Sequence, residues 1–270
     1  MKSHNPVLSR LGQAAERERA GAYAPAGPYA PPVGQPYPTG QAYPAAPPTV
    51  APMTIDDVVV RTVALLALTG VVGALAWVTV PEELTLPLWI GAAMVGLVLG
   101  LVISFRGVTN PLLIGAYAVV EGVFLGLVSR YYETFFDGIV LQAVLGTFGV
   151  FFLMALLYRM KVIRATPRFV RGVIGAMLGV FALMMMNLVL GLFGVNTHLR
   201  DGGPIAIGFS LVVIVVAALT FILDFHQVEE GVRYGLPRKY AWACAFGILV
   251  GLIWLYLEML RLLSYFQGDD

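Results

Sequence analysis

Seven long apolar stretches between residues 58 and 262 constrain this chain more than any other feature. Hydrophobic residues make up 59% of the sequence and charged residues 12%, where a soluble domain has about 25% charged residues. Each stretch approaches the roughly 20 helical residues that cross about 30 Å of hydrocarbon. The sequence therefore predicts an all-α membrane protein with seven transmembrane helices, at about 58–80, 87–105, 111–129, 138–158, 172–195, 204–226 and 240–262.

The N-terminal segment has a different composition, because alanine, glycine, proline and tyrosine dominate from Gly21 to Pro52. Repeated prolines exclude helix interiors, and such a tract cannot bury enough apolar area to offset its ordering entropy. It also lacks the apolar core and cleavage site of a signal peptide, so we expect it to persist. We predict a disordered cytoplasmic tail at 1–53, a transmembrane domain at 54–266 and a short C-terminal end at 267–270.

The positive residues predict the orientation of the bundle. If the N-terminus is cytoplasmic, the inner segments hold 14 of the 17 lysines and arginines, five of them between Arg159 and Arg171. Inner loops are enriched in such residues, so the N-terminus is predicted inside and the C-terminus outside. No basic pattern indicates a nucleic-acid surface. Cys244 has no second cysteine with which to form an intrachain disulfide.

Four spans contain the motif Gly-x-x-x-Gly, which lets helix backbones approach closely inside a membrane. We expect these glycines to lie at helix contacts and to support a compact bundle. They are Gly96 and Gly100, Gly122 and Gly126, Gly175 and Gly179, and Gly247 and Gly251.

Four polar residues inside the spans are candidates for function, because polar and ionisable groups in hydrocarbon are costly. Asp224 ends the sixth span, Glu121 lies near the middle of the third, Glu258 is in the seventh, and Asn187 is in the outer half of the fifth. Two purely structural interpretations remain open. Asp224 can be an interfacial carboxylate in contact with water, and Glu258 can be the i,i+3 partner of Arg261.

Depth along the helices limits which of these groups can meet. At 1.5 Å per residue, Arg106 and Asp224 both lie near the cytoplasmic boundary, whereas Glu121 is about 15 Å deep and Glu258 about 27 Å deep. Arg106 can therefore pair with Asp224, but Asp224 cannot reach Glu258.

Known catalytic motifs are absent from the sequence. There is no His-Glu-x-x-His, no Gly-x-Ser-x-Gly and no phosphate-binding Gly-x-x-x-x-Gly-Lys, and the histidines are scattered. An intramembrane aspartyl protease would need a second aspartate at the depth of Asp224, and no span interior offers one. We expect no enzymatic activity, no cofactor and no fixed metal site.

Several motifs resemble a known family in their joint order. They are the Asn110-Pro111 opening, Tyr117-Ala118-x-x-Glu121-Gly122, Asp224 at the end of the sixth span, and the closing run from Trp254 to Leu263. Together they look like a bacterial member of the Bax inhibitor (transmembrane Bax inhibitor motif) family over about 54–266. The resemblance implies six helices around a central seventh, acting as a pH-sensitive calcium leak in the bacterial plasma (inner) membrane.

In that family a pair of aspartates forms the proton sensor, and an arginine can latch the first of them. The first aspartate corresponds to Asp224, and Arg106 matches the latch by position. Aligning the Leu-Arg-Leu-Leu ends puts Gly251 where the second aspartate would stand. The acids that could substitute for it are Glu121, Glu229, Glu230 and Glu258.

Two functions are therefore consistent with the sequence. The first is a calcium or cation leak gated by protonation of membrane carboxylates, whose oxygens would bind calcium transiently and in competition with protons. The alternative is a non-transporting modulator of a membrane protease or stress-response partner, in which the tail and the Arg159–Arg171 loop would matter more. A proton-coupled secondary transporter would normally show inverted repeats, and seven spans do not divide into two halves.

Overall fold

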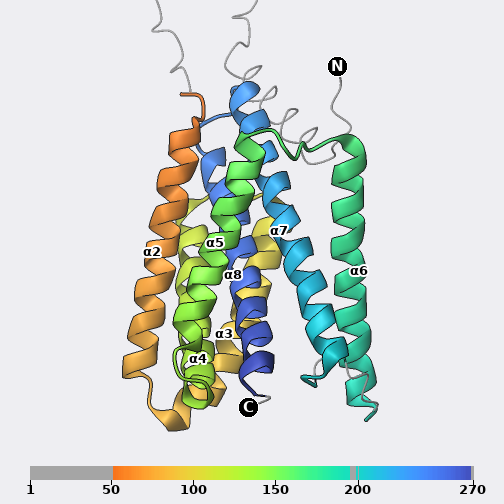
Figure 1. The fold of residues 1–270 in the computed structure, drawn as a ribbon. Helices are drawn as coiled ribbons and strands as arrows, with labels where there is room; N and C mark the ends of the chain where they lie inside the picture. Colours follow the sequence, from red (N-terminus) through yellow and green to blue (C-terminus); the bar gives the residue numbers. More distant parts are fainter. Residues whose placement is uncertain (1–50, 195–198, 200, 269–270) are drawn as a thin grey trace, which may run out of the picture.

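The structure is a computed structural model that describes residues 51–194, 199 and 201–268. Within this part of the chain, seven helices are long and apolar enough to cross a membrane, which confirms the predicted all-α membrane fold. The predicted tail at 1–53 lies almost entirely outside the described residues. Labelled as in Figure 1, the helices are α2 (Ile55–Thr79), α3 (Glu82–Arg106), α4 (Pro111–Phe135), α5 (Ile139–Arg159), α6 (Pro167–Leu192), α7 (Pro204–Arg233) and α8 (Tyr240–Gln267).

Local sequence signals explain where several helices begin and end. Thr54 and Asp57 form a capping box at the start of α2, in which each side chain accepts a hydrogen bond from the other residue's backbone N–H. Asn110 and Thr166 cap α4 and α6, and each is followed by a proline at the first helical position. Gly107 ends α3 with a φ of 59°, a left-handed conformation that glycine adopts without steric cost.

Most of the helices are longer than the apolar stretches that predicted them. A helix keeps its internal hydrogen bonds after it leaves the hydrocarbon, so apolar length sets a lower limit on helix length. The largest difference is in α7, which continues through Glu229 and Glu230 to Arg233 instead of ending near residue 226. The prediction that Asp224 ends this helix is therefore wrong, since Asp224 lies about 14 Å before the end of α7 at 1.5 Å per residue.

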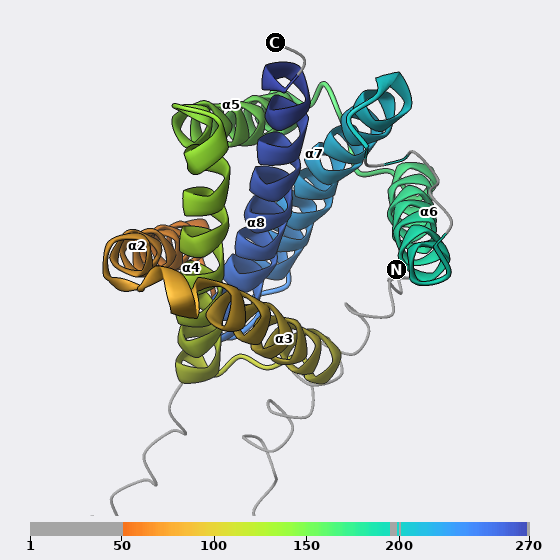
Figure 2. The same ribbon diagram turned by 90° about the horizontal axis from the view of Figure 1, so that it is seen from below.

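Helix α8 lies at the centre of the bundle and is the most buried of the seven helices. It packs directly against α2, α4, α5 and α7. Within the described residues, neither α3 nor α6 packs against α8, because α3 lies along α4 and α6 lies along α7. Figure 2 shows these two helices at the periphery. Of the six helices predicted to surround the last helix, four therefore pack directly against it.

The glycines of α4 bring α2 and α4 into close contact. A Cβ atom placed on Gly126 would lie 2.2 Å from the backbone oxygen of Gly73, and one on Gly122 would lie 2.7 Å from the backbone oxygen of Thr69. Such distances leave no room for a side chain, so this motif confirms the expected close approach.

The other three glycine motifs differ in what they contact. Gly96 and Gly100 in α3 face the side chains of Glu121 and Tyr117. Gly247 and Gly251 in α8 face the side chains of Asp224 and Phe221 in α7. The packing role predicted for Gly175 and Gly179 is wrong in this structure, because a Cβ on either would meet no described neighbour within 4 Å. The reason is that α6 packs against α7 alone and turns this row of glycines away from it.

Residues 51–53, which lead into α2, contact the α7–α8 turn. Met53 is 1% exposed, and its backbone N–H donates a 2.7 Å hydrogen bond to the carbonyl of Leu236 in the α7–α8 turn. The backbone N–H of Arg238 donates a 3.0 Å hydrogen bond to the carbonyl of Ala51. Residues 51–53, which the prediction assigned to the tail, therefore pack with the transmembrane domain.

Candidate functional site

Asp224 lies within α7 and faces α8. Its side chain is half-buried, and its Oδ1 atom is 3.6 Å from the position that a Cβ atom of Gly247 would occupy. The nearby thiol of Cys244, also on α8, interacts with it electrostatically. Among the described residues, no hydrogen bond or ion pair to the carboxylate is observed. Asp224 is therefore an acidic group at a helix contact that no described basic side chain neutralises.

The proposed latch between Arg106 and Asp224 is not formed. Arg106 is exposed at the end of α3, and α3 packs against α4 and not against α7. Arg106 is the last residue of α3, whereas Asp224 lies about 14 Å before the end of α7. A shared end of the bundle does not make two residues lateral neighbours, which depends on which helices pack together.

Glu121 is buried at the contact between α3 and α4. The side chain is 9% exposed, and its Oε1 atom lies 2.6 Å from the position of a Cβ on Gly96. Tyr117, one turn earlier on α4, interacts with the Glu121 carboxyl group, and its ring packs edge-on against Phe246 of α8. A glycine at position 96 is therefore what makes room for this carboxyl group.

Glu258 is buried between α7 and α8 with two polar partners. It is 1% exposed, accepts a 2.7 Å hydrogen bond from Ser210 of α7, and forms a 2.5 Å ion pair with Arg261. This geometry agrees with the structural interpretation in which Glu258 is the i,i+3 partner of Arg261. Asn187 is half-buried on peripheral α6 and lies on a helix that contacts neither α4 nor α8 in the described structure. The ion-pathway candidates are thus spread over different interfaces and do not line one path in this state.

The two acids considered as substitute sensors have partners of their own. The hydroxyl of Tyr158 on α5 donates a hydrogen bond to Glu229 and lies 3.5 Å from Nδ1 of His226. Glu230 lies 3.9 Å from Nε2 of the same histidine. These residues occupy the last turns of α7, beyond Asp224, and connect α7 to α5.

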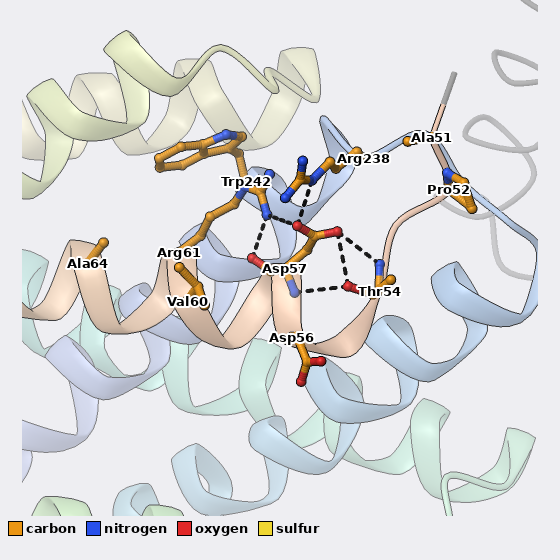
Figure 3. Close-up of a pocket in the computed structure, with 10 residues that line it drawn as sticks. All are labelled: Ala51, Pro52, Thr54, Asp56, Asp57, Val60, Arg61, Ala64, Arg238 and Trp242. Carbon is orange, nitrogen blue, oxygen red and sulfur yellow. Dashed lines mark hydrogen bonds and ion pairs between the residues drawn. The ribbon is translucent and has the colours of Figure 1, made fainter. Parts of the chain in front are cut away.

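A cluster that the sequence analysis did not single out lies at the same end of the bundle (Figure 3). Asp57 accepts hydrogen bonds from Arg61 at 2.9 Å and from Arg238 at 2.7 Å, and the indole of Trp242 lies 5.4 Å from the Arg61 guanidinium carbon. The capping box at residues 54–57, followed by arginine four residues after Asp57, is a local signal for part of this cluster. No local signal predicts the contribution of Arg238, which is 181 residues away in sequence.

The arrangement provides separate carboxylates and no preformed metal centre. In the part of the chain that the structure describes, no three His, Cys, Asp or Glu side chains come together in a way that could hold a metal ion.

Comparison with known proteins places the chain in a family. No curated protein matches it in sequence. The sequence profile of the family described as "Bax inhibitor 1 like" matches residues 5–268, which is nearly the whole chain. With seven described helices that are long and apolar enough to cross a membrane and with the last of them at the centre, this protein belongs to the Bax inhibitor 1-like family.

Proposed function

We propose that this protein is a pH-sensitive cation leak, with calcium as the permeating ion, in which Asp224 is the titrating group. The observation that supports the proposal best is the position of this carboxylate between α7 and α8, with no basic partner among the described residues. A carboxylate in a membrane bundle must bind a proton, a cation or water, because an isolated charge there is costly. Proton and cation binding at one group are then mutually exclusive.

The surroundings of Asp224 favour a sensor with one acid. Gly251, which occupies the position of the family's second aspartate, is one turn further along α8 than Gly247. A Cβ on Gly251 would lie 2.9 Å from Cε1 of Phe221, so the phenyl ring fills the space that a second carboxylate would need. A single acid binds one proton in one step, whereas a coupled pair releases its protons in two.

The other titratable groups near Asp224 do not form a second acidic site with it. Cys244 faces it from α8, and His226 follows it on α7. Glu229 and Glu230 lie further along α7 and interact with Tyr158 and His226. We therefore expect a pH profile of flux with the steepness of a single proton.

The test is dye-detected calcium entry into proteoliposomes of the purified protein between about pH 5.5 and 8, a range that covers shifted carboxylates. Asp224→Asn keeps the size of the side chain and removes the proton, so it should flatten the profile. Asp137→Asn, at an exposed residue of the α4–α5 turn, is the matched control and should leave the profile unchanged. A wild-type profile in Asp224→Asn would make Asp224 a structural residue and refute the sensor assignment.

Two further outcomes bear on the proposal. Because Arg106 does not contact α7 in the described structure, Arg106→Ala should leave the midpoint of the profile in place. A shifted midpoint would show that the latch forms in another state. If wild-type protein gives no flux at any pH in this partner-free system, the leak is refuted and the non-transporting modulator becomes the better hypothesis.

A further inference from the structure

The carboxylate of Asp57 is bound by two cations. The guanidinium groups of Arg61 and Arg238 both contact it, while Asp56, which lines the same cavity, points away from both arginines in Figure 3. The remaining acceptors of Asp57 are used by the N–H and hydroxyl of Thr54. One anionic group therefore serves two cations, and the cluster has capacity for a second anion.

Arg61 and Arg238 both have donors available for such an anion. The Nε atom of Arg61 is buried and has no hydrogen-bond partner in the described structure, although an unpaired buried donor is destabilising. Arg238 binds Asp57 through Nε, while its side chain is 62% exposed. The indole of Trp242 lies over the Arg61 guanidinium and limits its movement. A ligand oxygen would satisfy donors that the protein itself leaves open.

A cavity of about 630 Å³ lies against these two arginines. One part of its wall is polar and aromatic, formed by Arg61, Arg238 and Trp242. Another part is formed by Val60 and Ala64 of α2, which are exposed on the outside of the bundle, Val60 by 67%. Because these residues lie in the first turns of a membrane-spanning helix, the cavity is located where hydrocarbon meets the headgroup region.

We propose that this cavity binds an anionic phospholipid, with its phosphate between Arg61 and Arg238 and an acyl chain along Val60 and Ala64. Guanidinium groups match phosphate oxygens in charge and geometry. A free phosphate would use the arginines alone, whereas a lipid also covers the apolar wall. With the orientation predicted from the positive residues, the site faces the cytoplasmic leaflet, where anionic lipids attract basic residues near the surface.

The first test compares lipid binding by the purified full-length protein in native mass spectrometry and in thermal unfolding. Phosphatidylglycerol should remain bound and raise the unfolding midpoint, whereas phosphatidylcholine and inorganic phosphate at the same concentration should not. Arg238→Gln should weaken phosphatidylglycerol binding about fivefold, the usual contribution of one basic residue near an anionic membrane surface. Arg233→Gln is the matched control, because Arg233 is an exposed arginine near the same turn and does not line the cavity.

A second pair of variants leaves the ionic cluster intact. Ala64→Phe should fill the membrane-facing wall and reduce phosphatidylglycerol binding, while Ala67→Phe, exposed one turn deeper on α2 and not part of the cavity, should not. Equal binding of both phospholipids, or equal loss in Ala64→Phe and Ala67→Phe, would overturn the proposal. Stabilisation by inorganic phosphate as large as that by phosphatidylglycerol would overturn the lipid assignment and leave a simple anion site.

Discussion

The close contact between α2 and α4 makes Gly126→Ala the most informative stability variant. The added Cβ would lie 2.2 Å from the backbone oxygen of Gly73, whereas ordinary contact begins at 3.4 Å. The two backbones must separate by more than about 1 Å, and neither can yield as a flexible side chain would. Overpacking of this kind costs about 1–3 kcal/mol, and the rigid backbone on both sides places this variant at the upper end, near 3 kcal/mol.

The assay is unfolding of the purified protein in detergent, followed by tryptophan fluorescence. By the scaling of soluble domains of this size, about 3 kcal/mol lowers the unfolding midpoint by roughly 6–12 °C. Gly115→Ala is the matched control, since it lies on the same helix and its Cβ would meet no described neighbour within 4 Å. Alanine has the higher helix propensity, so this control should be neutral or stabilising by up to about 1 kcal/mol. Equal midpoints for the two variants would refute the argument that backbone contact holds α2 against α4.

Two other predictions concern the Glu258 pair and the orientation of the chain. Glu258→Gln should lower the free energy of unfolding by about 3 kcal/mol, because it leaves Arg261 without its anion. The double variant Glu258→Gln with Arg261→Gln should recover part of this loss. A double variant whose loss equals the sum of the two single effects would show that the two residues are not coupled. A reporter fused after Asp270 should read as extracytoplasmic, and one inserted between Arg159 and Arg171 as cytoplasmic, because positive residues concentrate in inner loops. A cytoplasmic signal after Asp270 would reverse the predicted orientation of the final helix.

The sequence predicts the number of spans because each helix that crosses the lipid needs an apolar stretch of its own. It predicts less well where helices end, as α7 shows, since polar residues can continue a helix into water. Pairing within one helix is also predictable, because residues three positions apart lie on the same face. Glu258 and Arg261 are accordingly paired, as one of the interpretations had it.

The sequence does not determine which helices pack side by side. Arg106 and Asp224 share an end of the bundle but lie on helices that do not touch in the described structure. Gly126 and Gly179 belong to identical motifs, yet one contacts a backbone and the other meets no described neighbour. The pairing of Asp57 with Arg238 likewise depends on how α2 and the α7–α8 turn assemble, and no local pattern encodes it.

The short bridge between residues 51–53 and 236–238 has a mechanical consequence. Two backbone hydrogen bonds and the buried side chain of Met53 fasten the entry to α2 onto the turn before α8. Ala51 is therefore anchored at the start of the central helix as well as at α2. A load applied at Ala51 would pass to the α7–α8 turn, and from there along the two helices between which Asp224 lies.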